Sequence, residues 1–243
     1  MAIALEQSVR TESVDTALDS GSLATGATAG NLLITVASAR WGASGPVGTF
    51  TVPNGYTLAF QIAPMEAHTA ALAYKVAAGG ETAVTWTADG TFDGTAVALD
   101  EFSGITSPVL DKTADDGTNA SSATSIATSS TGTLGASVGL AFLVGLARKS
   151  ANDGVLSNDA SMAEIRDLGV SGGSTSYNEC HAWQEFAAST AYNVTVSADA
   201  PGSRMGAGIA TFIADAGGAD PEGSLIRGKL LRGGLLLGGV LVR

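Results

Sequence analysis

Short runs of apolar and β-branched residues, each bounded by turn residues, dominate the first hundred positions of the chain. Turn clusters such as "VPNGY", "AGGE" and "DGTFDG" separate them, and the spacing of about 8–14 residues is typical of a β-sandwich or barrel. No long segment keeps the 3.6-residue apolar period of an amphipathic helix. The pattern therefore predicts an all-β fold. The expected strands are residues 31–39, 56–63, 70–78, 82–89 and 95–102.

The same order of strands returns later in the chain. "VTWTAD" at residues 84–89 reappears as "VTVSAD" at 194–199, and "NLLITVASAR" corresponds to "GLAFLVGLAR" about 108 residues on. At these offsets Phe102 corresponds to Phe212, and Tyr74 corresponds to Trp183 as a matched core aromatic. We expect an internal pseudo-repeat of roughly five strands per half, over about residues 29–105 and 137–213.

The polar stretch at residues 111–137 lies between the two halves and allows two interpretations. It could link two small sandwiches, or it could contain a solvent-facing strand, "SSATSIATSS", of a single sandwich that mixes both halves. We favour the single sandwich, because five strands alone would enclose a thin core. The expected organisation is a jelly-roll-like β-sandwich over residues 1–216, followed by a linker and tail over 217–243.

The C-terminal tail, residues 223–243, has a period of its own. Gly223, Gly228, Gly233 and Gly238 recur every five residues, and a pair of large aliphatic residues follows at the same step. Five residues match neither the helical period nor the two-residue period of a half-exposed strand, so apolar groups would point to every side. We expect other protein surfaces to enclose this tail.

Membrane insertion and a disordered end are the alternatives for the tail. Its longest charge-free run, residues 235–242, is far too short to span a bilayer. We therefore assign the tail an assembly role, as an extended Gly/Leu-rich element. The expected contact residues are Leu225, Ile226, Arg227, Leu230, Leu231, Arg232, Leu235, Leu236, Leu237, Val240, Leu241 and Val242.

Charge divides the chain in the same way. All 23 acidic residues and 8 of the 12 basic ones precede Gly223, so the first 222 residues carry a net charge of −15 and the tail carries +4. An acidic body disfavours nucleic-acid binding, which needs a basic footprint. The single cysteine, Cys180, allows no intramolecular disulfide, so the fold does not rely on oxidation and is compatible with a reducing cytoplasm.

Two short motifs carry reactive side chains. "GASVG" places Ser137 in a formal G-x-S-x-G match, but a polar stretch precedes it and a strand pattern follows, so we interpret it as a turn into a strand. In "NECHAW", a strand would put Glu179 and His181 on one face and Cys180 on the other. Metal sites need three or four ligands, so a cross-strand polar pair beside a buried thiol is the favoured interpretation. We expect no catalytic residue, metal or cofactor.

Acidic turns and aromatic residues offer weaker candidates. The segments at residues 89–94 and 111–117 are expected to be surface turns, with a weak cation site as the alternative. Most aromatic residues lie inside apolar strand patterns. Trp41, in "ARWGASGP", falls in an expected loop and is the best candidate for an exposed contact, for example with a glycan.

The runs "GNLLITVA", "ALAYKVAAGGETAVTWTAD", "ALDEFSGITSPVLD" and the returning "VTVSAD" with "GAGIATFI" resemble those of bacteriophage virion proteins. The resemblance is to jelly-roll β-sandwich proteins of phage heads and tails, such as decoration proteins, head fibres and tail-associated proteins. It implies a non-catalytic structural role in the virion, assembly in the host cytoplasm, and partners among virion proteins and copies of the chain itself. A carbohydrate-binding or host-adhesion module is the alternative.

Overall fold

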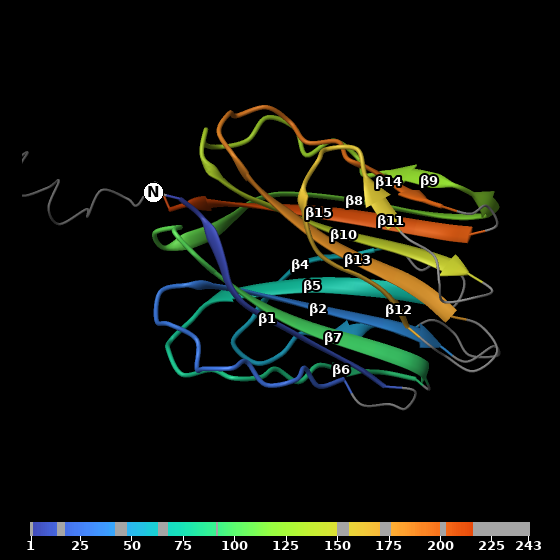
Figure 1. The fold of residues 1–243 in the computed structure, drawn as a ribbon, viewed down its shortest axis with the longest axis horizontal. Helices are drawn as coiled ribbons and strands as arrows, with labels where there is room; N and C mark the ends of the chain where they lie inside the picture. The colour runs from blue at the N-terminus through green and yellow to red at the C-terminus, as the bar shows by residue number, and fades with distance from the viewer. Residues whose placement is uncertain are drawn as a thin grey trace, which may run out of the picture. The chain divides into compact units, whose positions relative to one another are not determined.

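The computed structural model describes residues 2–13, 18–41, 48–62, 68–90, 92–149, 156–170, 176–199 and 203–215. The chain divides into two compact units, Met1–Ile213 and Ala214–Arg243, and the tail lies outside the described residues. The first unit is all-β in its described part, as predicted, and its strands form two large sheets (Figure 1).

Residues from the first half of the chain form one five-stranded antiparallel sheet, in the order β1-β7-β2-β5-β4. A two-stranded sheet of β3 and β6 accompanies it. The strands are β1 (Ala4–Ser13), β2 (Leu32–Trp41), β3 (Phe50–Thr51), β4 (Thr57–Gln61), β5 (His68–Val76), β6 (Thr87–Ala88) and β7 (Phe92–Ser103).

Residues from the second half form the other five-stranded sheet, in the order β12-β13-β10-β15-β8. A three-stranded sheet in the order β11-β14-β9 accompanies it. The strands are β8 (Pro108–Ala123), β9 (Ser125–Ala127), β10 (Gly139–Lys149), β11 (Leu156–Asn158), β12 (Ala163–Val170), β13 (Ser176–Phe186), β14 (Thr195–Ala198) and β15 (Ser203–Ala214).

The two large sheets face each other as a β-sandwich, with the sheet of β1, β2, β4, β5 and β7 below the sheet of β8, β10, β12, β13 and β15 in Figure 1. An apolar cluster between them takes residues from both sheets, among them Leu32, Leu72, Phe142 and Phe212. Because this core needs both halves, the chain forms one sandwich.

Each large sheet is also covered on its outer face. Leu18, Leu23 and Trp86, from the segments beside the first sheet, pack on its outer side chains. Leu156, Val194 and further residues cover the second sheet in the same way. Central strands are therefore buried on both faces, which explains why β2 is apolar at most positions on both of its faces, as expected for such a strand.

Trp86 shows how the outer core is tied to the sheet. Its side chain is 1% exposed, and its indole N–H donates a 3.0 Å hydrogen bond to the Thr35 hydroxyl of β2. Trp86→Phe is expected to lower the free energy of unfolding by about 1–2 kcal/mol, because it removes the donor and leaves a gap. Urea unfolding checks this, with the half-buried Trp183→Phe as the matched control, expected to cost less. Equal losses in the two variants would contradict the assignment.

The two halves repeat each other residue by residue. Leu32 pairs with Phe102 on one side and with Val76 on the other, and Leu140 pairs in the same way with Phe212 and Glu185. Edge strands β4 and β12 have a register shift at the same place, between Leu58 and Phe60 in one and between Glu164 and Arg166 in the other. Equivalent residues therefore differ in number by 106 to 110, depending on the strand.

A pseudo-two-fold axis relates the halves. Tyr74 contacts Phe212 edge to face at 5.1 Å and 64°, and the equivalent residues Trp183 and Phe102 do so at 5.4 Å and 65°. His68 and Tyr177 are equivalent to each other through their registers with Arg40 and Arg148, and their rings are in contact at 5.2 Å. Contact between equivalent positions places this pair at the axis.

Several details differ from the expectations. Jelly-roll connectivity is not confirmed, because each of the two large sheets takes all its strands from one half of the chain. Residues 111–117, expected to be a turn, belong to β8, whose extended pairing beside β15 outweighs the local turn signal. The run at residues 82–89 contributes only an isolated bridge at Thr85 and the two residues of β6. The polar strand expected within residues 121–130 corresponds to the last residues of β8 and to β9, whereas β1 and the rest of β8 lie outside the predicted strands.

Candidate functional site

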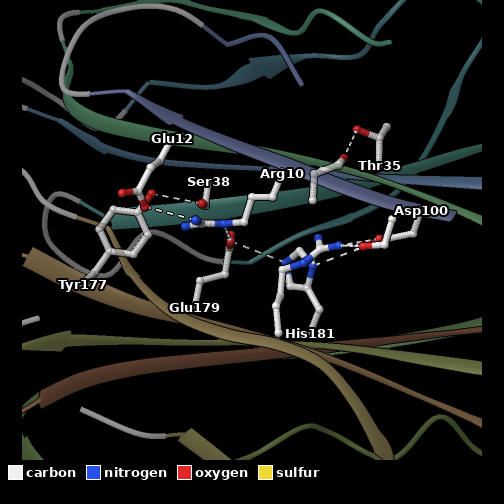
Figure 2. Close-up of polar contacts among 11 residues, drawn as sticks. Arg10, Glu12, Thr35, Ser38, Asp100, Tyr177, Glu179 and His181 are labelled. Carbon is white, nitrogen blue, oxygen red and sulfur yellow. Dashed lines mark hydrogen bonds and ion pairs between the residues drawn. The ribbon is translucent and has the colours of Figure 1, made fainter. Parts of the chain in front are cut away.

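Strand β13 directs two titratable side chains into the space between the sheets. Glu179 is 1% exposed and His181 is fully buried, and both face the first sheet (Figure 2). Cys180, between them, is buried in the outer apolar cluster of the second sheet. The prediction that a strand would separate Glu179 and His181 from Cys180 is confirmed.

Arg166 of β12 connects His181 to the opposite sheet. One guanidinium nitrogen lies 2.9 Å from His181 Nδ1, and another forms a 2.5 Å ion pair with Asp100 of β7 and also donates to the Ser8 hydroxyl. A guanidinium can only donate, so His181 Nδ1 must accept and the proton of the neutral ring sits on Nε2. That Nε2 lies 3.6 Å from Glu179 Oε1.

Arg10 of β1 makes the second ionic link between the sheets. Its Nε donates to Glu179 at 3.2 Å, and another guanidinium nitrogen donates to Glu12 at 3.0 Å. A third polar link joins Ser38 to the Tyr177 hydroxyl at 2.9 Å. These residues lie together between the two sheets, and we call them the inter-sheet cluster. Its members are Ser8, Arg10, Ser38, Asp100, Arg166, Tyr177, Glu179 and His181, with Glu12 at its edge.

Burial and charge set the protonation states within the cluster. Burial alone would raise the pKa of Glu179, but the adjacent His181 and Arg10 outweigh it and hold that pKa well below its usual range. Burial lowers the pKa of His181, and the Arg166 guanidinium opposes a second ring proton, while Glu179 and Asp100 act in the other direction. At neutral pH Glu179 is therefore an ionised carboxylate and His181 a neutral imidazole, beside the Arg10 and Arg166 guanidinium groups.

The buried charges of this cluster balance, and they lie on opposite sheets. Asp100 and Arg10 come from the first sheet, whereas Arg166 and Glu179 come from the second, so each ion pair bridges the sandwich. Removing one partner of such a pair leaves a desolvated charge without its countercharge, which typically lowers the free energy of unfolding by about 3–5 kcal/mol. The arrangement uses its acid, base and cations to fix one sheet against the other.

Sequence reasoning found Glu179 and His181 but missed their partners. Asp100 lies in the mostly apolar run "TAVALDEF", and the structure shows it fully buried. A carboxylate within such a strand indicates a buried cationic partner, because an unpaired carboxylate does not stay in a core. Arg10 and Arg166 sit on edge strands 156 residues apart and offer no comparable local signal.

The other predicted site residues are not brought to this cluster. Ser137 is exposed in a bend just before β10 begins at Gly139, with no helix after it. Trp41 is the last residue of β2, in register with Phe92, and its side chain lies outside the described part, as do all the predicted tail contacts. Of the acidic segments, Asp93 pairs with Arg40 at 2.5 Å, and Asp111 accepts from the Gly135 amide at 2.8 Å.

Within the described residues, no group of three or more His, Cys, Asp or Glu side chains is placed to hold a metal ion. The same part of the chain contains no helix long and apolar enough to cross a membrane. No protein-family model, curated protein or solved structure matches the chain.

Proposed function

We propose that the chain is a structural component of a bacteriophage particle, either a capsid decoration, head-fibre or tail-associated protein, and that it assembles through residues 223–243. The observation that carries the proposal is the tail's five-residue repeat of glycine and paired aliphatic residues, cationic on an otherwise acidic chain. Such a segment gains most from burial between protein surfaces, since each fully buried aliphatic side chain contributes about 1.5–3 kcal/mol.

The architecture of the body supports this role. Its two sheets are covered on both faces, and the buried acid, base and cations between them bond to one another across the sandwich. This suits a protein that presents a stable surface to copies of itself and to other particle proteins. In this role the chain acts without a cofactor, outside membranes and without nucleic-acid contacts.

Removing the tail tests the proposal. The chain ending at Glu222 is expected to keep its fold but to lose oligomerisation and incorporation into particles, as measured by light scattering and by co-sedimentation with particles. In the full-length chain, Leu231→Asp with Leu236→Asp is expected to act like the deletion, because it puts charge into two apolar pairs. Ser224→Asp adds charge outside these pairs and serves as the matched control.

A truncated or Asp-substituted chain that assembles normally would refute the assembly role. Glycan binding that survives removal of the tail would instead favour the second candidate, a carbohydrate-binding or host-adhesion module. That module has fewer aromatic residues to use than the composition suggests, because Trp86 and Tyr177 are each only 1% exposed.

A further inference from the structure

The inter-sheet cluster breaks the pseudo-two-fold symmetry of the sandwich. Val36 pairs with Ala98 in the first half, and its equivalent Val144 pairs with Gly208 in the second, so Ala98 and Gly208 are equivalent positions. Two residues further along β7 and β15, Asp100 is therefore equivalent to Ala210. Through the same registers, Phe60 is equivalent to Arg166. Leu72 is equivalent to His181, and Ala70 to Glu179. Every ionic position in the second half, and Asp100 in the first, thus has an apolar counterpart.

The counterpart of the ionic contact is a close apolar one. Phe60 and Ala210 belong to the core between the sheets, and the Phe60 ring packs directly on Gly208 of β15. A Cβ atom at Gly208 would lie 2.3 Å from that ring, so only glycine leaves room for it. The equivalent of Gly208 in the first half is Ala98, which has a Cβ. The inner faces of the two halves therefore differ in both charge and shape.

These differences make each inner face complementary to the other half and not to a copy of itself. If two first halves paired about the same axis, each Asp100 would face a Phe60 ring, and each ring would meet Ala98 where Gly208 now lies. If two second halves paired, each Arg166 would face Ala210. Both arrangements bury unpaired charges twice, which is strongly unfavourable.

We infer that the inter-sheet cluster and the Phe60–Gly208 contact form a pairing code, by which the inner face of the first half accepts a second half and rejects another first half. The code matters wherever copies are crowded, because two halves of the same fold could otherwise mispair between chains. It does not depend on the tail, and it allows one kind of exchange, in which two chains trade second halves.

The connection between the halves is suited to such an exchange. Only residues 104–107 separate β7 from β8, and Gly104 and Ser107 adopt positive φ angles of 89° and 45°. The left-handed conformation is unfavourable for serine. A short linker held in this conformation loses its backbone strain when it extends. Strained short linkers favour domain swapping, here the reciprocal exchange of second halves between two chains.

Complementation between two full-length variants tests the code. Asp100→Ala leaves Arg166 without its carboxylate, and Arg166→Met leaves Asp100 without its guanidinium, so each variant alone should lose about a hundredfold to several thousandfold in its folding equilibrium constant. The double variant in one chain removes both charges and should regain most of the stability. Leu58→Ala, at a 42% exposed position of β4, is the control for a neutral substitution.

The decisive measurement refolds the two single variants together at high concentration, each with its own affinity tag. Trading second halves gives one sandwich with both charges and one with neither. We expect a mixed species that carries both tags and unfolds at a higher temperature than either variant alone, and no comparable species when either variant is refolded with a differently tagged copy of itself.

Three results would overturn the inference. Single variants as stable as the wild type would show that the pair is not needed, and a double variant no better than the single ones would show that the charges do not act together. A rescued double variant without any mixed species would show that the contact stabilises the chain but does not select its partner.

Discussion

Replacing Glu179 by alanine is expected to lower the free energy of unfolding by about 3–5 kcal/mol. Glu179 is the buried partner of Arg10 across the sandwich, and its Oε1 also lies 3.6 Å from the ring nitrogen of His181 that carries the proton. The alanine variant leaves the Arg10 guanidinium, with a side chain 8% exposed, without its buried countercharge. Urea unfolding followed by tryptophan fluorescence measures the loss.

Glu12 supplies the matched control, since it is the other carboxylate bonded to Arg10. Its side chain is 45% exposed, so water replaces most of what the ion pair contributes, and Glu12→Ala should cost about 1 kcal/mol or less. Arg10→Met with Glu179→Leu in one chain should recover most of the stability lost in Glu179→Ala, because neither charge is then stranded. A Glu179→Ala variant no weaker than Glu12→Ala would rule out the proposed role of the inter-sheet pair.

The strands that sequence reasoning predicted best are those whose signal is local. Residues 31–39 are mostly apolar and contain no charged residue, a pattern typical of a strand buried on both faces, and β2 is such a strand. The correspondence of Tyr74 with Trp183 could be read from spacing alone, because β5 and β13 keep their register through both halves. Because the same spacing of apolar residues occurs in both halves, each half supports the strand assignment of the other.

The elements that sequence reasoning missed depend on partners far along the chain. Strand β8 is polar and rich in turn-forming residues, but as an edge strand it needs only one neighbour, β15. The local sequence of β8 does not indicate that it pairs with β15. The same holds for Arg166, whose carboxylate partner is 66 residues away in the other sheet. Charge pairs of this kind are set by how the sheets face each other, which no periodicity encodes.

Acidification is expected to destabilise the body in two steps, first through His181 and then through Glu179. The pKa of His181 is lowered by burial, so below its ordinary value of 6.5 the unfolded chain takes up a proton that the folded chain refuses, and stability falls as the pH drops. The pKa of Glu179 is lowered from 4.5, so its contribution is fully present above that value and is lost as the pH falls below it. Each proton contributes a slope of up to about 1.4 kcal/mol per pH unit.

His181→Leu separates the first step from the second, because leucine is the residue that the equivalent position, Leu72, already holds. The groups that face His181 are Glu179, Asp100 and Arg166, and all of them remain in this variant. The free energy of unfolding, measured by urea titration at several pH values, should lose its slope between pH 6.5 and 5 and keep the steeper decline below pH 4.5. His68 is present in both the wild type and the His181→Leu variant, so its contribution cancels when their free energies of unfolding are subtracted at each pH. An unchanged slope above pH 5 would mean that the inter-sheet cluster exchanges no proton through His181, and the neutral ring tautomer inferred from its bond to Arg166 would then be wrong.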